Sequence, residues 1–212
     1  MIAIVDYGAG NLRSVQKGFE RSGIGAHITD EAEQIRRAHG VVLPGVGAFR
    51  DCYGGITARG LGDVVLESVS TGKPFLGICV GLQLLFTESE EGGRSPGLDI
   101  INGPVRRFPS SDERKVPHMG WNQIEIVREE CPLFDGVESG SFVYFVHSYY
   151  VSPTEENAIA CVTEYGVRFC SAIWRDNLFG VQFHPEKSQQ VGLKILGNFA
   201  QIVREYRQSN GY

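Results

Sequence analysis

The sequence predicts an α/β protein with a mostly parallel sheet, helices on both faces of that sheet, and antiparallel strands added in the second half. Two observations indicate this class. In the first half of the 212 residues, short apolar runs alternate with segments of helical periodicity, which is typical of parallel strands joined by helices. In the second half, strand-like runs follow one another through short polar turns. Since neither a repeat nor a linker stands out, we expect one domain over residues 1–212.

The first half is expected to alternate between strand and helix from its start. Leu12, Val15 and Phe19 form one helical stripe, and GVVLPG at 40–45 suits a buried strand that ends in a Pro-Gly turn. Strands are expected at 2–7, 27–29, 40–45 and 74–78, and helices at 11–23 and 57–71, with a further helix opening at residue 80. The glycine-rich stretch 92–97 predicts a surface loop.

The second half is expected to supply the antiparallel strands and a closing helix. The strand-like runs are VRRF (105–108), QIEIV (123–127), FVYFV (142–146), AIACVTEY (158–165), RFCSAIW (168–174) and LFGVQF (178–183). The segment 191–206 places its apolar residues at helical spacing, and we therefore expect an amphipathic helix that packs on the sheet.

Composition and charge argue against several classes of function. The net charge of −5 and the lack of a long basic run give no electrostatic basis for binding nucleic acid or a membrane surface. No apolar stretch approaches the ~18 residues of a membrane-spanning helix, and the N-terminus does not resemble a signal peptide. We therefore expect a cytoplasmic protein. The five scattered cysteines include no C-x-x-C pair, so we expect neither a disulfide framework nor a thiolate metal site. No metal or organic cofactor is suggested by the sequence, and we expect none.

The stretch LGICVGLQLLF at 76–86 places Cys79 between Gly77 and Gly81, at the junction of an expected strand and helix. The form G-x-nucleophile-x-G at such a junction is typical of a sharp turn that presents a nucleophile at the edge of a sheet. The first N–H groups of the helix would favour a thiolate, and the N–H of Val80 is placed to donate to an oxyanion. The alternative is that Cys79 is a small core residue.

A nucleophilic thiol needs a base, and FGVQFHPEKS at 179–188 offers one. In an extended chain His184 and Glu186 project to the same side, and Pro185 stiffens the segment. Glu186 would then orient the imidazole while His184 takes the thiol proton. The alternative is an exposed turn after a strand.

Two other histidines and one further motif are weaker candidates. His147 is the main rival base, but its alternation with Phe145 on one strand face favours a buried structural histidine. His118 lies between a proline and a glycine and is expected in a loop. DYGAGNL at 6–12 resembles the opening of a dinucleotide-binding motif, but Arg13 stands where the third glycine is needed.

Taken together, the cysteine turn and the late His-x-Glu resemble the class I glutamine amidotransferases. PGVGAF (44–49) lies where that family has a glycine-rich oxyanion strand. This segment, with KVPHMGWN (115–122), YFVHSYY (144–150) and QFHPEKS (182–188), is similar to the glutaminase subunits of imidazole glycerol phosphate synthases. The resemblance runs from residue 1 to about residue 205, and it implies a flavodoxin-like fold.

The resemblance implies that glutamine is hydrolysed to glutamate and ammonia through a thioester on Cys79. His184 and Glu186 would complete the catalytic triad. Backbone N–H groups of Val80 and of the segment that contains Val46 and Gly47 would bind the oxyanion.

The resemblance also assigns residues that hold the substrate. Positions that match the family's glutamine site are Gly47, Gln83, Ser148 and Tyr149. Gln83 follows Cys79 at i+4, so both side chains can face one pocket. The alternatives are a helix-surface amide for Gln83 and ordinary strand residues at 148 and 149.

A partner is implied as well, namely a separate (β/α)₈-barrel cyclase subunit that receives the ammonia in histidine biosynthesis. Positions that match the family's interface are Asn11, Trp121, Tyr144 and Lys187. Core packing is the alternative for the two aromatic residues, helix capping for Asn11, and a solvated charge for Lys187.

Val46 suggests a control step, because valine resists backbone states with positive φ. Relatives with P-G-G-P-G have glycine at this position, and a peptide flip near Val46 would be the step that the partner controls. Three other functions remain open from the sequence: a glutaminase subunit of another synthase, a cysteine hydrolase or peptidase, and a catalytically silent subunit.

Overall fold

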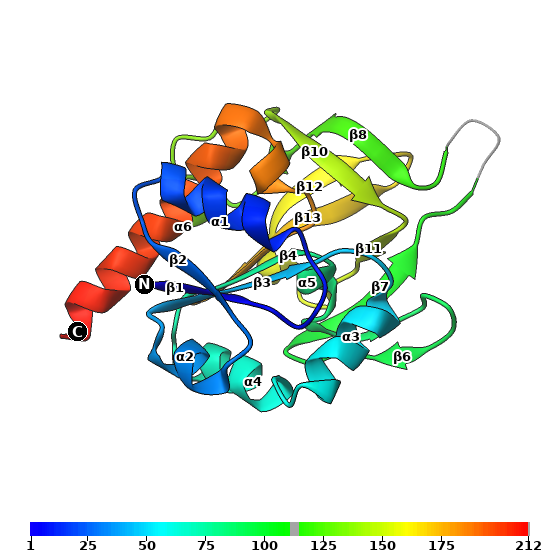
Figure 1. The fold of residues 1–212 in the computed structure, drawn as a ribbon. Helices are drawn as coiled ribbons and strands as arrows, with labels where there is room; N and C mark the ends of the chain where they lie inside the picture. Colours follow the sequence, from blue (N-terminus) through cyan, green and yellow to red (C-terminus); the bar gives the residue numbers. More distant parts are fainter. Residues whose placement is uncertain (111–114, 212) are drawn as a thin grey trace.

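The computed structural model describes residues 1–110 and 115–211, and Figure 1 shows a central sheet with helices on both sides of its parallel half. The strands of this half are β1 (Ile2–Val5), β2 (Ala26–Thr29), β3 (Gly40–Gly45) and β4 (Phe75–Cys79). They pair in parallel in the order β2-β1-β3-β4, and β14 (Leu178–Val181) continues the parallel sheet beside β4.

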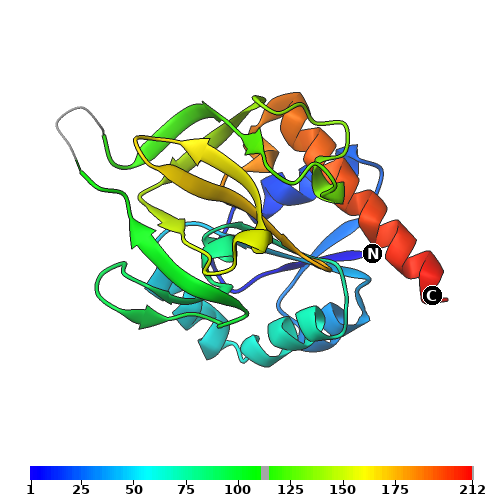
Figure 2. The ribbon, with the colours of Figure 1, turned by 180° about the vertical axis from the view of Figure 1, so that it is seen from behind.

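Helices cover both faces of the parallel strands. The helices are α1 (Leu12–Arg21), α2 (Ala32–Arg37), α3 (Phe49–Ala58), α4 (Gly62–Ser70), α5 (Val80–Gln83) and α6 (Gln189–Ser209). The helices α1 and α6 lie together on one face, and α2, α3 and α4 lie on the other, as the two opposite views show (Figures 1 and 2). None of the helices in the described part of the chain combines the length and apolarity needed to cross a membrane.

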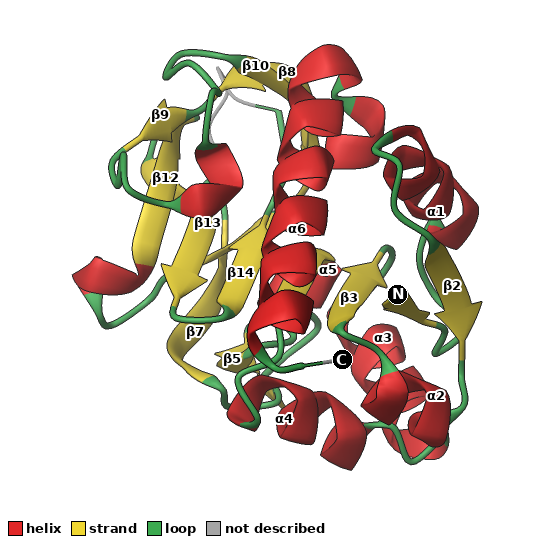
Figure 3. Cartoon of the chain, turned by 90° about the vertical axis from the view of Figure 1, so that its left-hand side faces the viewer, coloured by secondary structure: helices red, strands yellow, loops and turns green. Residues whose placement is uncertain are grey.

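The antiparallel strands extend the sheet beyond β14 (Figure 3). They are β5 (Phe86–Ser89), β6 (Ser95–Pro96), β7 (Ile101–Arg107), β9 (Glu125–Ile126), β11 (Tyr149–Val151), β12 (Ile159–Glu164) and β13 (Arg168–Arg175), of which β5 and β7 pair in parallel. A separate two-stranded ribbon joins β8 (His118–Gln123) to β10 (Phe142–His147). Short 3₁₀ turns cover 132–134, 156–158 and 185–187. The predicted fold class is confirmed.

Some element predictions were wrong, and packing explains each error. The predicted helix 57–71 is two helices, because Gly60 adopts φ +64° and ends α3. The start of α3 was missed because Gly54 and Gly55 lower its helix propensity, yet Phe49 and Ile56 bury one face of it. The helix after Cys79 is a single turn, since the chain re-enters the sheet as β5 at Phe86. The predicted loop 92–97 contains β6, the missed helix α2 follows β2, and 123–127 is divided between β8 and β9.

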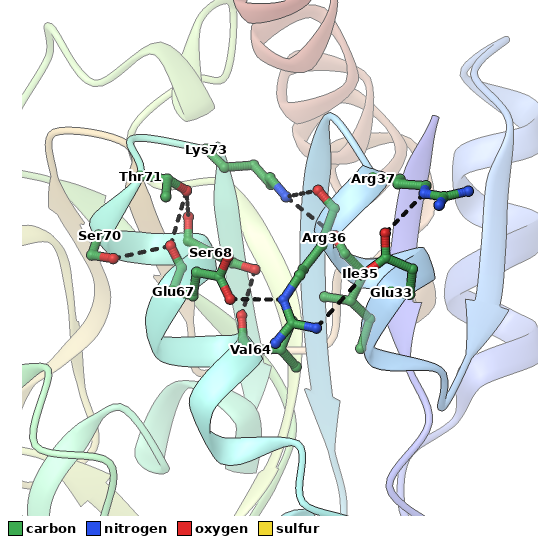
Figure 4. A network of polar contacts seen from close by, with 10 residues as sticks. All are labelled: Glu33, Ile35, Arg36, Arg37, Val64, Glu67, Ser68, Ser70, Thr71 and Lys73. Carbon is green, nitrogen blue, oxygen red and sulfur yellow. Dashed lines mark hydrogen bonds and ion pairs between the residues drawn. The ribbon is translucent and has the colours of Figure 1, made fainter.

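A buried lysine links α2 to the chain that follows α4 (Figure 4). Lys73 is 8% exposed, and its ammonium group donates to the carbonyl oxygens of Ile35 (3.1 Å) and Arg36 (2.8 Å) at the C-terminal end of α2. The orphan carbonyls of a helix end and its negative dipole end both favour a cation there. Lys73 therefore fastens the short helix α2 against the edge of the core.

Candidate active site

Cys79 lies at a sharp turn between β4 and α5, with φ 56° and ψ −113°. Such a backbone state is strained for a residue with a side chain, and it persists only where the surroundings impose it. The flanking glycines show how they do so. A Cβ atom on Gly81 would lie 1.8 Å from the carbonyl oxygen of Leu43, and one on Gly77 would lie 2.9 Å from the backbone nitrogen of Leu82. Only glycines allow the turn to fold this tightly onto β3.

His184 reaches the same place because β14 runs parallel to β4, with Val181 opposite Ile78. Its Nδ1 lies 2.8 Å from Oε1 of Glu186, and both side chains are almost completely buried. The segment 185–187 is a 3₁₀ turn rather than the extended chain that the sequence suggested, and this turn brings the carboxylate onto the ring. The alternative of an exposed turn is wrong, since His184 is 1% exposed.

The charge state of His184 follows from its two neighbours. Burial lowers the pKa of the imidazole, but its contacts with Cys79 and Glu186 outweigh burial and raise that pKa to about 10. The imidazole is therefore protonated at neutral pH. Among the described residues, His184 Nε2 and Glu186 Oε2 have no partner in hydrogen-bonding geometry. Glu186 thus holds the imidazole through Nδ1, which leaves Nε2 as the nitrogen that can exchange a proton.

A cavity of about 470 Å³ opens over Cys79 and His184. Of the residues predicted for the site, Asn11, Val46, Gly47, Val80, Gln83, Ser148, Tyr149 and Lys187 also line it. The residues that line it also include His147 and a carboxylate that was not predicted, Glu91, which accepts a 2.8 Å hydrogen bond from the N–H of Phe49. A chamber of this size with convergent polar groups suits a small polar molecule.

Gln83 is 3% exposed and holds a relay of hydrogen bonds, so the alternative of a surface amide is wrong. Its Nε2 donates to the carbonyl of Tyr149 (3.0 Å) and to Oε1 of Gln182 (3.1 Å). The backbone carbonyl of Tyr149 can only accept, which fixes the direction of both amides. Gln182 therefore turns its Nε2 toward the sulfur of Cys79, at 3.8 Å. The sequence analysis missed Gln182, although it stands two residues before His184 on the same strand face.

The segment after β3 lies beside Cys79 because Gly45 pairs with Cys79 in the parallel register. Val46 is 38% exposed at the cavity, and Gly47 adopts φ +91°. The positive φ expected to be difficult for Val46 is thus taken by the following glycine. Val46, Gly47, Val80 and Cys79 thus line one chamber.

The two rival histidines hold each other instead of the thiol. His147 Nδ1 lies 2.8 Å from the carbonyl oxygen of Tyr149, and its Nε2 lies 2.9 Å from Nδ1 of His118. Burial lowers the pKa of His147 to about 3 and that of His118 to about 4, so both rings are neutral at neutral pH. His147 is buried, in line with the structural role expected for it, but His118 is the first residue of β8 and not a loop residue.

The four residues that match the family's interface lie around the mouth of the cavity and on the β8–β10 ribbon. Trp121 is 46% exposed and packs edge-on to Tyr144 at 6.0 Å, and Lys187 Nζ lies 5.8 Å from the centre of the Tyr144 ring. Core packing therefore does not explain Trp121. Asn11 occupies the N-cap position of α1 without a side-chain cap bond, so the capping alternative is wrong.

Comparison with known proteins places this chain among its relatives. The family Glutamine amidotransferase class-I matches residues 3–202. The chain is 58% identical to the imidazole glycerol phosphate synthase subunit HisH of Syntrophotalea carbinolica, over 95% of this chain and 100% of that protein. It is 54% identical to the subunit of the same name from Geobacter sulfurreducens, over 95% of this chain and 98% of that protein.

Solved structures agree on the fold. A glutamine amidotransferase structure superposes with a TM-score of 0.74 at 17% identity, covering 96% of this chain and 100% of that one. The structure of PurLQS from Thermotoga maritima gives a TM-score of 0.70 at 17% identity, covering 97% of each chain. The family match and the identity to the two subunits confirm the resemblance inferred from the sequence motifs, and the solved structures confirm the fold.

Proposed function

This chain belongs to the class-I glutamine amidotransferase family, and on that premise we propose that it hydrolyses glutamine and supplies the ammonia to a synthase. One observation carries the proposal: Cys79 stands on a strained turn at the cavity, beside an imidazole that is bonded to a buried carboxylate. This is the arrangement of a nucleophile, a base and a residue that orients the base.

We propose that the Cys79 sulfur attacks the side-chain amide carbon of glutamine. The thiol proton already resides on His184 when the sulfur attacks, and the electron pair of the amide C=O moves onto oxygen. Collapse of this tetrahedral species breaks the C–N bond, and His184 gives its proton to the nitrogen, which leaves as ammonia. Water then attacks the γ-glutamyl thioester, the now neutral His184 takes a proton from it, and glutamate leaves as the sulfur regains its negative charge beside the protonated His184.

The backbone around the cavity would stabilise the oxyanion and hold the substrate. The N–H of Val80 and one from Val46 or Gly47 are the proposed oxyanion donors. Gly47, Gln83, Ser148 and Tyr149 would hold the glutamine. Glu91 adds a negative charge at the cavity that complements the α-ammonium group of the substrate.

The acceptor of the ammonia is proposed to be a separate (β/α)₈-barrel cyclase subunit, in a heterodimer that makes imidazole glycerol phosphate for histidine biosynthesis. The name of these relatives, imidazole glycerol phosphate synthase subunit, supports a partner. The partner would contact Asn11, Trp121, Tyr144 and Lys187. We also propose that residues 1–212 act as a single glutaminase domain in the cytoplasm.

Partner control would act at Val46. We expect the peptide between Gly45 and Val46 to turn its N–H toward the oxyanion only when the partner and its ligand are bound. Low glutaminase activity of the isolated chain and a large rise with the partner are therefore expected. Equal activity in both states would contradict this control.

A glutamate-release assay, run with and without the barrel cyclase and its nucleotide ligand, tests the proposal. Wild type should release glutamate and become labelled at Cys79 by diazo-oxo-norleucine, whereas Cys79→Ser should do neither. Cys131→Ser is the matched control, because Cys131 is a buried thiol that does not line the cavity. Undiminished glutamate release by Cys79→Ser would remove Cys79 from the mechanism, and ester or peptide cleavage without glutamate release would indicate a hydrolase of another kind.

A further inference from the structure

Two buried side chains hold the end of β3 and the residue that follows it, and neither has a role in the mechanism above. The hydroxyl of Tyr7 donates to the carbonyl oxygen of Pro44. The thiol of Cys52, on α3, donates to the carbonyl oxygen of Val46 at 3.3 Å. Tyr7 is 1% exposed and Cys52 is 0% exposed, so both contacts are made inside the core.

The contact with Cys52 sets the direction of a backbone donor at the cavity. The C=O and N–H groups of a trans peptide point in opposite directions. Because the Val46 carbonyl is directed to the buried thiol of Cys52, the N–H of Gly47 is directed away from the core. Both residues line the cavity over Cys79, so this N–H faces the side where the substrate would bind.

Both side chains keep the protons that these contacts need. Burial raises the pKa of the Cys52 thiol, and it raises the pKa of Tyr7 as well. At neutral pH each group is therefore a hydrogen-bond donor rather than an anion. A carbonyl oxygen can only accept, so an ionised thiol at this position would repel it.

The surroundings leave the segment little freedom to move as a whole. A Cβ atom on Gly45 would lie 2.7 Å from the Tyr7 hydroxyl and 2.6 Å from the backbone nitrogen of Gly81, in the turn that follows Cys79. The same α3 that carries Cys52 packs closely on Tyr7, since a Cβ on Gly55 would lie 2.5 Å from the Tyr7 carbonyl oxygen. Tyr7, Cys52 and the cysteine turn thus form one packed unit around residues 44–47.

We propose that Cys52 and Tyr7 are positioning residues for the glutaminase reaction, which hold the carbonyls of Val46 and Pro44 so that the Gly47 N–H faces the glutamine at Cys79. This inference rests on the function proposed above. The two held peptide units flank the Gly45–Val46 unit, which neither side chain holds. Rotation of a peptide group within residues 44–47 is thereby confined to the Gly45–Val46 peptide. The N–H groups of Gly45 and Gly47, on either side of it, keep their directions.

The experiment measures kcat and KM for glutamine hydrolysis by the full chain with the barrel cyclase subunit and its ligand present. Cys52→Ala removes the donor, Cys52→Ser keeps a donor, and Tyr7→Phe removes the hydroxyl alone. Cys170→Ala is the matched control, because Cys170 is also a buried thiol that donates to a backbone carbonyl, that of Ala172, at 3.3 Å. Thermal unfolding of each variant is measured in parallel.

We expect Cys52→Ala and Tyr7→Phe to lower kcat by roughly tenfold, since small displacements of groups at a reacting centre cost about 10–100-fold in rate. KM should change by less than about twofold, and Cys52→Ser should return kcat to within about threefold of wild type, since a hydroxyl replaces the thiol as donor. Cys170→Ala should keep the kcat of wild type even if its midpoint of unfolding falls as far as that of Cys52→Ala.

Equal kcat values for Cys52→Ala and Cys170→Ala, with wild type active, would overturn the inference and leave the proposed function intact. A Cys52→Ser variant as slow as Cys52→Ala would overturn it too, because the donor would then not matter. If Cys52→Ala does not fold, Tyr7→Phe takes its place in the comparison. A kcat of Tyr7→Phe equal to that of Cys170→Ala would then overturn the inference, whereas a roughly tenfold lower kcat, with Cys52→Ser near wild type, would support it. A wild-type chain that releases no glutamate would overturn the proposed function and this inference with it.

Discussion

Two buried polar regions of this molecule differ in whether their polar atoms have hydrogen-bonding partners. Around Lys73 the ammonium group is directed at two carbonyls of the α2 C-terminus, and Asn177 ties the neighbouring chain through the carbonyls of Val69 and Lys73 (Figure 4 shows the lysine). At the candidate site, His184 and Glu186 are as deeply buried, but His184 Nε2 and Glu186 Oε2 have no hydrogen-bonding partner among the described residues.

The difference separates groups that stabilise the fold from groups that remain available for chemistry. A buried polar atom without a partner costs about 1–3 kcal/mol, so it persists where something other than stability requires it. The region around Lys73 should therefore respond to mutation in stability and not in rate. The site should respond in rate, and its contribution to stability should depend on pH.

The largest effect is expected for Glu186→Gln. The amide keeps the shape of the side chain but loses the charge that holds the imidazole, as an Asp→Asn change does in a serine protease triad, where kcat drops by about 10⁴. We expect glutamate release to fall by roughly 10²–10⁴-fold with the fold unchanged. Steady-state kinetics and circular dichroism check this. Activity within about threefold of wild type would show that Glu186 does not orient His184.

The second effect is on the pH dependence of stability. The pKa of His184 is raised to about 10 in the folded chain, from an ordinary value of 6.5. The raised pKa stabilises the folded chain fully below pH 6.5, and this contribution is lost as the pH rises through 10. Glu186→Gln should lower the folded pKa and flatten the loss. Urea unfolding at pH 6, 8 and 10 measures both slopes, and identical slopes would contradict the pairing.

The third effect is a loss of stability without a loss of rate. Lys73→Met keeps much of the apolar stem but leaves two helix carbonyls without their cation, and we expect the free energy of unfolding to fall by about 1–3 kcal/mol. kcat should stay within about twofold of wild type, because the Lys73 ammonium group bonds to the carbonyls of Ile35 and Arg36, and neither of these residues lines the cavity. A large fall in kcat would show that the two regions are coupled.

The smallest effect is expected for Arg36→Ala. Arg36 pairs with Glu67 at 2.9 Å, but both side chains are more than 40% exposed and solvent screens the pair. The midpoint of thermal unfolding and the rate of glutamate release should both equal those of wild type. A clear fall in the midpoint would mean that the exposed ion pair of Arg36 and Glu67 also contributes to stability, in addition to the buried ammonium group of Lys73.

Sequence alone located the parts of the site that depend on local spacing. Gly77 and Gly81 around Cys79 predicted the turn, and the i, i+2 relation of His184 and Glu186 predicted their pairing. Gln182 was also within reach of that argument, because it stands two residues before His184. The family resemblance then supplied the cavity residues.

Other features depend on contacts between distant segments and carry no local signal. Cys52 lies near the start of α3, which was not predicted because Gly54 and Gly55 lower the helix propensity there. Its hydrogen bond to the Val46 carbonyl depends on how α3 packs. Glu91 lies in a polar stretch and reaches the cavity only because it accepts a hydrogen bond from the start of α3. His118 was misjudged because its flanking proline and glycine favour a loop, whereas pairing with His147 makes it part of the ribbon.

The parallel register of β3 and β4 sets which changes of chain length this enzyme family can tolerate. Gly45 stands opposite Cys79, so the length of each strand sets where Cys79 lies relative to Val46 and Gly47, the proposed nucleophile relative to its proposed donors. Deleting one residue from β3 would move the donors along the strand and turn its side chains to the opposite faces. Insertions and deletions should therefore be absent from 40–45 and 75–79.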